Sequence, residues 1–548
     1  MAALSYAHGT STVALLGETI GANLEATTRR VGDALALVEC ATERRWDYPG
    51  LLGWSRKLAR SLLGAGVAKG DRVALWSPNC AEWVALQYAT AMVGAVLVNV
   101  NPAYRTSELE FVLRQSGARL LFSATSFRHS DYRAMAEQVR PALDGLEDVV
   151  YIGDTSWDRF ESMSEAVSAE ALEAVEASLS FDDPINIQYT SGTTGFPKGA
   201  TLTHHNILNN GFFVAELLGY TVDDRVCLPV PFYHCFGMVM GNLGATSHGS
   251  AIVIPAPLFD PEATLSSVQA ERATSLYGVP TMFIAELGLD NFASFDLSSL
   301  RTGLMAGSPC PVEVMKRVQS EMHMHEVGIA YGMTETSPVS TQTRRDDDLE
   351  RRTETVGRVM PHIEIKIVDP ASGLTVDRGA TGELCTRGYS VMSGYWGEPD
   401  KTAEVIDMAG WMHTGDLAVM RDDGYVNIVG RIKDMVIRGG ENIYPREIEE
   451  FLYTHPRIAD VAVVGVPDAA YGEELVAWIQ LRPGAEPLDA GSLADFCRGR
   501  IAHHKIPRYV RICESFPMTV TGKIRKVEMR QVSTGELGLS GAASTRTA

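Results

Sequence analysis

A short loop rich in glycine and hydroxyl groups constrains this chain more than any other feature. Residues 190–199 read Thr-Ser-Gly-Thr-Thr-Gly-Phe-Pro-Lys-Gly, so that Lys198 follows a serine and three threonines. Glycines let the backbone approach an anion and adopt positive φ, while hydroxyls and an ammonium group supply donors and charge. The loop therefore predicts a site for the phosphates of a nucleoside triphosphate.

The residues around the loop predict its place in the fold. Upstream, Ile185, Ile187 and Tyr189 alternate with polar residues, as in a strand, and downstream Thr203 is a candidate cap for an apolar helical pattern. We therefore expect the loop to join a strand to a helix. Pro197 stands where the GxxxxGK[ST] pattern of a P-loop NTPase requires glycine, which makes that class the weaker interpretation. A mobile surface loop is the other alternative.

Length and charge restrict the class of protein. A chain of 548 residues with 45% hydrophobic content predicts two or more folded domains. The formal net charge of −20 would repel nucleic acid and the anionic face of a membrane, so anionic ligands need local donors. Basic residues do gather at Arg431, Lys433, Arg438, Lys505, Arg508, Lys523, Arg525 and Lys526.

The cysteines and the apolar segments bear on location. Eight scattered cysteines without a CxxC pair indicate neither a zinc site nor a disulfide framework, which suits a reducing cytosol. Residues 1–17 lack the features of a signal or transit peptide. The uncharged run Trp83–Val100 fits a buried helix followed by a buried strand better than a membrane span. We predict a cytoplasmic protein.

The pattern along the chain predicts an α/β fold. Helix and strand patterns alternate from residue 50 to 330 as in two stacked α/β layers, with helices near 81–93 and 108–115 and strands near 96–100 and 118–123. Beyond residue 350, alternation such as that of Ile363, Ile365 and Ile367 predicts a small antiparallel or barrel-like subdomain.

The domain boundaries follow from a change in amino-acid composition near residue 430. We place a large N-terminal domain at 1–430, a hinge in the basic, glycine-rich segment 431–435, and a small mobile α+β domain at 436–535. The small, polar tail 536–548 is expected to be disordered.

Five further segments follow the loop in a fixed order. They are Tyr233-His234-Cys235-Phe236-Gly237, Tyr331-Gly332-Met333-Thr334-Glu335, Thr414-Gly415-Asp416-Leu417, Arg431 to Asp434 with Arg438 to Asn442, and Pro517 to Lys523. From about residue 50 to 530 the chain thus resembles the adenylate-forming, AMP-binding superfamily of acyl-CoA synthetases, non-ribosomal adenylation domains and beetle luciferases. The resemblance implies formation of an acyl-adenylate from a carboxylate and ATP, then transfer to a thiol, with Mg²⁺ and coenzyme A.

The resemblance also implies which residues bind the nucleotide. They are Thr190, Ser191, Gly192, Thr193, Thr194, Gly195, Lys198, Gly307, Ser308, Pro309, Tyr331, Gly332, Met333, Thr334, Asp416, Ile428, Arg431 and Lys523. Among them, Tyr331 would stack on adenine, and Asp416 and Arg431 would contact the ribose. Glu335, with Thr194, would hold Mg²⁺, which prefers oxygen ligands.

Further roles implied by the resemblance concern catalysis and domain movement. Lys523 would stabilise charge during adenylation, together with Glu335, Thr194 and His234. Lys433 would be the hinge about which the C-terminal domain rotates between the two half-reactions. Gly439 and Gly440 would line the tunnel for the pantetheine chain of coenzyme A, where a missing side chain leaves room.

The acyl pocket would contain His234, Met238 and Gly332. Members of the family restricted to acetate carry tryptophan where this chain has Gly332, so we expect a deeper pocket, in which each methylene adds about 0.8 kcal/mol of burial. Met238 stands where long-chain enzymes often have a tryptophan gate, and its adaptable side chain suits a medium or variable acyl length. The chain looks most like the medium-chain fatty-acyl-CoA synthetases.

Other interpretations stay open at this point. They are an enzyme that loads a carrier protein in trans, a ligase for branched or aromatic acids, a luciferase-type oxygenase, and an ATP-binding regulator without catalysis. Expected partners are the small-molecule substrates, with no nucleic acid and no membrane span. Peripheral membrane association and a homodimer are left open.

Overall fold

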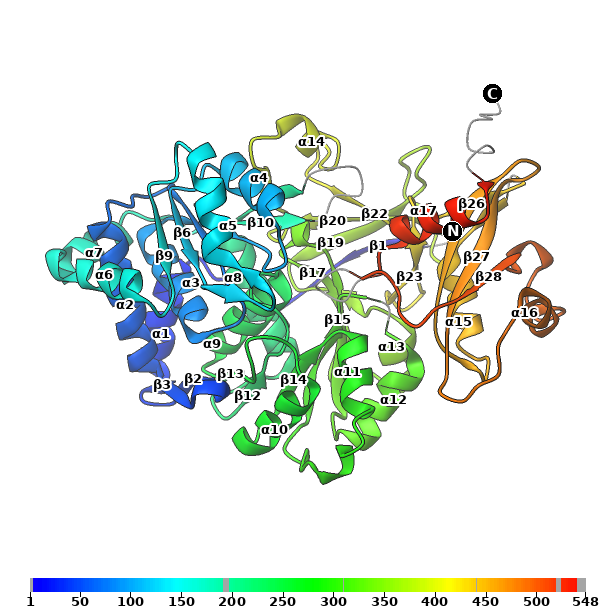
Figure 1. The fold of residues 1–548 in the computed structure, drawn as a ribbon, viewed down its shortest axis with the longest axis horizontal. Helices are drawn as coiled ribbons and strands as arrows, with labels where there is room; N and C mark the ends of the chain where they lie inside the picture. Colours follow the sequence, from blue (N-terminus) through cyan, green and yellow to red (C-terminus); the bar gives the residue numbers. More distant parts are fainter. Residues whose placement is uncertain (1–2, 191–196, 309, 440, 519–523, 540–548) are drawn as a thin grey trace. The chain divides into compact units, whose positions relative to one another are not determined.

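The computed structural model describes residues 3–190, 197–308, 310–439, 441–518 and 524–539 (Figure 1). The chain forms two compact units. The larger comprises Ala7–Ile365 and Thr386–His413, and the smaller comprises Met1–Tyr6, Lys366–Cys385 and Thr414–Ala548. This division assigns residues 366–385 and 414–430 to the same unit as the C-terminal domain. The hinge at 431–435 stays a prediction.

A seven-stranded sheet of the larger unit has the order β21-β11-β10-β5-β4-β6-β9. Its strands are β4 (Arg72–Trp76), β5 (Val96–Asn99), β6 (Leu120–Ser123), β9 (Asp148–Tyr151), β10 (Pro184–Thr190), β11 (Lys198–Thr203) and β21 (Gly394–Tyr395). The pairs between β10 and β9 are parallel, whereas β11 is antiparallel to both of its neighbours. With α2 (Tyr48–Gly64), α3 (Ala81–Val93) and α4 (Thr106–Ser116), this sheet confirms the predicted alternation of helices and strands.

Helix α3 explains the long uncharged run of the sequence. Every residue from Ala81 to Val93 is buried, and Gly94, at φ 70°, ends the helix before β5. The predicted buried helix and strand are thus confirmed. Among the described residues, no helix combines the length and the hydropathy that a bilayer crossing needs.

A nine-stranded sheet forms the second layer of the larger unit, in the order β18-β17-β16-β15-β14-β12-β13-β2-β3. Its strands are β2 (Leu35–Glu39), β3 (Arg44–Asp47), β12 (Arg225–Cys227), β13 (Ala251–Ile254), β14 (Ser275–Gly278), β15 (Thr302–Ala306), β16 (Glu326–Gly332), β17 (Val339–Gln342) and β18 (Arg358–Val359). Figure 1 shows α10 (Pro261–Glu271), α11 (Pro280–Leu287) and α12 (Val312–Glu321) beside β14 and β15. Leu276, Phe283 and Met305 are fully buried in the core between these elements.

The described residues also form two five-stranded sheets and a two-stranded sheet of β7 (Ser126–Phe127) and β8 (Ser130–Asp131). One five-stranded sheet has the order β1-β19-β20-β22-β23 and the other β25-β24-β27-β26, with β28 beside β27. The first contains β1 (Tyr6–His8), β19 (Ile363–Val368), β20 (Thr381–Gly388), β22 (Met412–Met420) and β23 (Val426–Arg431). Burial of Ile363, Ile365 and Ile367 confirms the predicted alternation.

The C-terminal segment combines helices and strands, as expected for an α+β domain. Its elements are β24 (Val436–Arg438), β25 (Glu441–Ile443), α15 (Pro445–Leu452), β26 (Ile458–Asp468), β27 (Gly472–Leu481), α16 (Ala490–Cys497), β28 (Tyr509–Ile512) and α17 (Lys526–Glu536). Helix α17 ends at Glu536, where we expected the tail to begin, and residues 540–548 lie outside the described part.

Helix α8 (His204–Leu218) begins after the predicted cap Thr203, which forms a capping box with Asn206. Thr203 Oγ1 accepts the N–H of Asn206 at 3.1 Å, and Asn206 Oδ1 accepts the N–H of Thr203 at 2.8 Å. The next side chain, His204, is fully buried, and its Nδ1 accepts the N–H of Ile20 at 3.2 Å. Burial lowers the pKa of His204 to about 4, because desolvation disfavours the imidazolium.

The buried His204 predicts a loss of stability in mild acid. An unfolded histidine has a pKa of about 6.5, so the unfolded state is protonated at this residue below that pH. In the folded state His204 becomes protonated only below about pH 4. Between pH 7 and pH 5 this difference in proton binding lowers the free energy of unfolding by about 2 kcal/mol. The variant His204→Gln should lack this pH-dependent loss. Urea unfolding of both proteins at the two pH values measures the difference.

The control is His129→Gln, because His129 is exposed. That variant should keep the pH dependence of the natural sequence. A constant difference in unfolding free energy between His204→Gln and the natural sequence from pH 7 to pH 5 would show that His204 does not carry the effect.

Candidate functional site

The frame of the predicted phosphate loop is a strand hairpin. Thr190, the last residue of β10, lies opposite Lys198, the first residue of β11, and Gly199 lies opposite Tyr189. The loop therefore joins two antiparallel strands, and α8 follows only after β11. Our expectation of a strand-to-helix loop was wrong, because the short, glycine-containing segment 198–203 lacks a clear strand period. Ser191, Gly192, Thr193, Thr194 and Gly195 lie outside the described residues.

A buried carboxylate lies near Lys198. Glu335 belongs to the 3₁₀ turn Thr334–Thr336 directly after β16 and is 6% exposed. Its Oε1 accepts the hydroxyl of Tyr395 at 2.8 Å, and the Lys198 ammonium lies 4.9 Å from the centroid of the Tyr395 ring. Burial and the neighbouring Glu335 raise the pKa of Tyr395, so this phenol stays a hydrogen-bond donor. The structure thus brings together two predicted site residues through a tyrosine that the sequence did not indicate.

The ends of β15 and β16 bring another predicted group together. These strands are parallel, with Ala306 beside Ala330, so Gly307 and Ser308 follow next to Tyr331. Gly307 adopts φ 89°, a conformation that favours glycine. Loops after the carboxyl ends of parallel strands are a common place for ligands. Met333 and Thr334 continue from β16, and Pro309 lies outside the described residues.

The smaller unit contains the predicted ribose residues. Asp416 on β22 lies opposite Arg431 on β23, and Arg431 Nε donates to Asp416 Oδ1 at 2.9 Å. The Asp416 side chain is 8% exposed and that of Arg431 is 59% exposed. Ile428, also on β23, lies opposite Ala418. Asp416 is therefore a buried carboxylate whose position is fixed by an exposed guanidinium.

The predicted hinge and tunnel residues lie in the same unit. Lys433 is exposed in the turn between β23 and β24, where the N–H groups of Asp434 and Met435 donate to the carbonyl of Arg431. Gly439, at φ 61°, donates its N–H to the carbonyl of Tyr471 at 2.8 Å. Gly440 and Lys523 lie outside the described residues.

Basic residues of the C-terminal segment make ion pairs. Arg438 binds Glu474 through Nε and Nη2, each at 2.8 Å, and the Glu474 side chain has no exposed surface. Lys505 pairs with Glu447 at 2.5 Å, and Arg508 pairs with Asp468 at 3.2 Å. These contacts neutralise part of the basic cluster that the sequence indicates.

His234 and Met238 lie at the start of a buried helical segment. His234 Nδ1 accepts the N–H of Phe236 at 3.1 Å, so the neutral imidazole carries its proton on Nε2. Residues Phe236–Leu243 form a π-helix, a rare element that often occurs at functional sites.

Met238 is held by what we call the amide–thioether cluster, which consists of Asn99, Gln188, Cys235 and Met238. The side-chain amides of Asn99 and Gln188 both donate to Met238 Sδ at 3.0 Å, and the Cys235 thiol donates to Gln188 Oε1 at 2.9 Å. All four residues are buried. The cluster fixes the position of the side chain at the predicted gate.

Gly332 ends β16 next to a bulge in the pairing with β17. A Cβ atom built there would lie 1.8 Å from the carbonyl oxygen of Pro338 and 3.0 Å from the nitrogen of Ser340. The direction of a side chain at this position thus leads into the backbone of the neighbouring strand.

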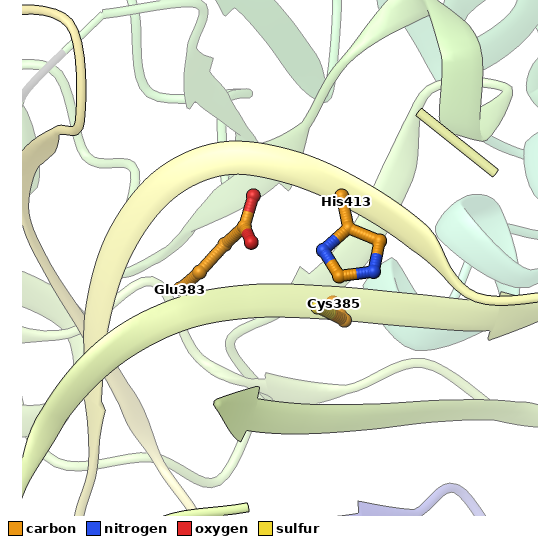
Figure 2. A group of neighbouring side chains, drawn as sticks. All are labelled: Glu383, Cys385 and His413. Carbon is orange, nitrogen blue, oxygen red and sulfur yellow. The ribbon is translucent and has the colours of Figure 1, made fainter. Parts of the chain in front are cut away.

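All eight cysteines lie in the described part of the chain and are free thiols. Figure 2 shows one of them, Cys385, on β20 with Glu383, and also labels His413 of β22. Glu383 Oε1 accepts the N–H of Gly415 at 3.0 Å, and the Thr414 hydroxyl donates to the carbonyl of Leu384 at 2.7 Å. These contacts fix the backbone directly before Asp416.

Two family models match the sequence. That of the AMP-binding enzyme covers residues 24–396, and that of the AMP-binding enzyme C-terminal domain covers residues 447–523. The first contains the loop hairpin, Tyr331 and Glu335, and the second begins inside α15.

Similar proteins extend the match over nearly the whole chain. The protein YngI of Bacillus subtilis (strain 168), named as a candidate acyl-CoA synthetase, is 49% identical over 545 residues, which cover 96% of this chain and 99% of that protein. The mitochondrial medium-chain acyl-CoA ligase ACSF2 of Danio rerio is 42% identical, with 98% of this chain and 91% of the relative covered.

A solved structure agrees in fold. The crystal structure of the anthranilate CoA ligase AuaEII with anthranoyl-AMP has a TM-score of 0.86 at 26% identity, and the match covers 95% of this chain and 98% of that chain. The family models, the full-length relatives and the shared architecture lead to one conclusion: this chain belongs to the AMP-binding enzyme family, in its acyl-CoA synthetase branch.

Proposed function

We propose that this protein activates a medium-chain fatty acid with ATP and transfers the acyl group to coenzyme A. The observation that carries this proposal is the 40–42% identity to medium-chain acyl-CoA ligases over at least 96% of this chain. In the first step a carboxylate oxygen of the acid bonds to the α-phosphorus of ATP, and the bond to pyrophosphate breaks. In the second step the thiol sulfur of coenzyme A attacks the acyl carbon, and AMP leaves.

The nucleotide would be bound by the residues that the resemblance implies. Lys198 and the hydroxyls of the loop would meet the β- and γ-phosphates, Tyr331 would stack on adenine, and Asp416 with Arg431 would bind the ribose hydroxyls. A solved relative, MatB from Rhodopseudomonas palustris, contains bound ATP and has a TM-score of 0.81 at 28% identity, which supports this proposal.

The donor set near Lys198 fits Mg²⁺. Glu335 offers a buried carboxylate, and oxygen is the ligand that Mg²⁺ prefers. Glu335, with Thr194, would hold the ion, which when bound supplies positive charge beside the phosphates. Lys523 would add a cation as the negatively charged acid approaches, because preorganised charge is the usual large contribution to such reactions.

The second step would use a different orientation of the C-terminal domain. Lys433 is exposed in a turn, so its backbone can change dihedral angles without breaking a strand. Gly439, which presents no side chain, would then line the path of the pantetheine chain together with Gly440. The coenzyme A phosphates would meet Lys505 and Arg508, in competition with Glu447 and Asp468.

The acyl chain would extend past His234 towards Met238. Met238 lies in the buried π-helix, where apolar surroundings favour methylene groups, and His234 lies two residues before it. The absence of a side chain at Gly332 is weaker support for a deep pocket than we expected, because the space it leaves is filled by the backbone of Pro338 and Ser340.

A second candidate substrate is an aromatic acid. The anthranilate CoA ligase has the same fold over 95% of this chain, which supports this alternative at lower sequence identity. Transfer to a carrier protein in place of coenzyme A is a further alternative. For location, the eight free thiols support the reducing compartment that we predict from the sequence.

The substrate proposal predicts a clear dependence on chain length. In ATP–pyrophosphate exchange, kcat/KM should rise about fourfold per methylene from acetate to about eight carbons, because each buried methylene contributes about 0.8 kcal/mol. Thioester formation with coenzyme A is followed by mass spectrometry. Reactions without acid are the control, and a maximum with anthranilate or benzoate would favour the aromatic alternative.

The surroundings of Gly332 predict that even Gly332→Ala disturbs the fold. The added carbon would lie 1.8 Å from a carbonyl oxygen, and overpacking of this kind costs about 1 to 3 kcal/mol. Urea unfolding should show this loss, and activities on propionate and octanoate should fall together. The control is Gly53→Ala in α2, where nothing lies within 4 Å. Normal stability with a selective loss on octanoate would instead support Gly332 as a pocket residue.

The role proposed for Lys523 predicts separate effects on the two half-reactions. Lys523→Ala should lower acid-dependent exchange by about 10² to 10³, because charge stabilisation is lost. Thioester formation from supplied acyl-AMP and coenzyme A should persist. The control is Lys316→Ala, which removes a half-exposed lysine paired with Glu313 on α12. An equal loss in both half-reactions would contradict the role.

A further inference from the structure

The residue that connects Lys198 to Glu335 is Tyr395, to which neither the sequence nor the proposed reaction assigns a role. Its hydroxyl donates to Glu335 Oε1 at 2.8 Å, and both side chains are buried. A hydrogen bond to an ionised carboxylate is about twice as strong as one between neutral groups. The contact therefore restricts the rotation of the Glu335 carboxylate and leaves Oε2 as the oxygen for another ligand.

The backbone around Tyr395 is fixed on several sides. Tyr395 lies opposite Ala200 in the β11–β21 pair, and its N–H donates to Thr402 Oγ1 at 2.9 Å. The N–H of Ser393 donates to the carbonyl of Thr201 at 3.0 Å, and that of Trp396 donates to the carbonyl of Gly199 at 2.7 Å. The tyrosine is thus attached to the strand that follows the phosphate loop.

The ring of Tyr395 also contacts the lysine of that loop. The Lys198 ammonium lies 4.9 Å from the ring centroid, within the range of a cation–π interaction. One aromatic side chain therefore contacts a cation through its ring and a carboxylate through its hydroxyl.

We propose that Tyr395 is a positioning residue that orients the Glu335 carboxylate for a nucleotide-bound divalent cation and fixes Lys198 beside it. This inference rests on the proposed function, in which Glu335 and Lys198 act on Mg²⁺ and the ATP phosphates. A partner that orients a metal ligand typically contributes 10-fold to 100-fold in metal affinity or activity.

The test uses Tyr395→Phe in the full-length protein, because this change removes the hydroxyl and keeps the ring. Binding of Mn²⁺ in the presence of a non-hydrolysable ATP analogue, followed by electron paramagnetic resonance, should show about a 10-fold rise in Kd. In octanoate-dependent ATP–pyrophosphate exchange, the Mg²⁺ concentration that gives half the maximal rate should also rise about 10-fold. At saturating Mg²⁺ the KM for ATP should change less than about threefold, because the ring contact to Lys198 remains.

Two further variants separate the contributions. Tyr395→Leu also removes the ring, so the KM for ATP should rise in addition. Tyr220→Phe is the matched control, because its buried hydroxyl contacts Ser275 Oγ at 2.5 Å, away from Glu335, and Mn²⁺ binding should not change.

The outcomes distinguish the two proposals. An unchanged Kd for Mn²⁺ in Tyr395→Phe would overturn the role of Tyr395, even if the natural protein catalyses exchange. If the natural protein showed no acid-dependent exchange but Tyr395→Phe weakened Mn²⁺ binding, the reaction would be wrong and the positioning role would stand. Loss of Mn²⁺ binding in Tyr220→Phe as well would show a general effect on the fold and count against the role.

Discussion

The hydrogen bonds on both edges of strand β11 fix the frame of the predicted phosphate loop. On one edge β11 pairs with β10, so Lys198 lies opposite Thr190, and on the other edge it pairs with β21, which carries Tyr395. A strand paired on both sides cannot shift without breaking two ladders. Glu335 comes from the other large sheet, and the Tyr395 hydroxyl connects it to this frame. The relative positions of Lys198, Tyr395 and Glu335 thus depend on the register of one short strand.

The parts of the fold that depend on local patterns could be predicted from the sequence. The position of α3 follows from the uncharged run Trp83–Val100, and the cap at Thr203 follows from a hydroxyl directly before an apolar helical pattern. The hairpin that contains the loop could not be predicted, because β11 is short, is buried on both faces and carries only one large apolar side chain, Leu202. Tyr395 and Glu335 are 60 residues apart, and a single sequence contains no signal for that contact. The surroundings of Gly332 could not be predicted either, because the sequence does not indicate the direction in which a side chain at this position would point.

Two arginines of this acidic chain differ in how firmly carboxylates hold them. Arg438 is bound on two nitrogens by the fully buried Glu474, and such a pair is fixed, since removing either partner leaves an uncompensated charge. Arg431, by contrast, keeps 59% of its side chain exposed while it contacts the buried Asp416. Binding an anion at Arg431 therefore does not require this side chain to leave the interior. The same step near Arg438 would require a buried carboxylate to lose its partner.

The amide–thioether cluster restricts how this protein can change by mutation. The Cys235 thiol orients the Gln188 amide, which together with Asn99 directs its N–H groups at Met238 Sδ. A change at position 238 to a hydrocarbon side chain would take the acceptor from the buried Gln188 amide, which costs about 1 to 3 kcal/mol, whereas the Asn99 amide would keep the carbonyl of Tyr233 at 2.9 Å. A substitution at position 238 is therefore coupled most directly to positions 188 and 235, because the Cys235 thiol holds the Gln188 amide that donates to Met238.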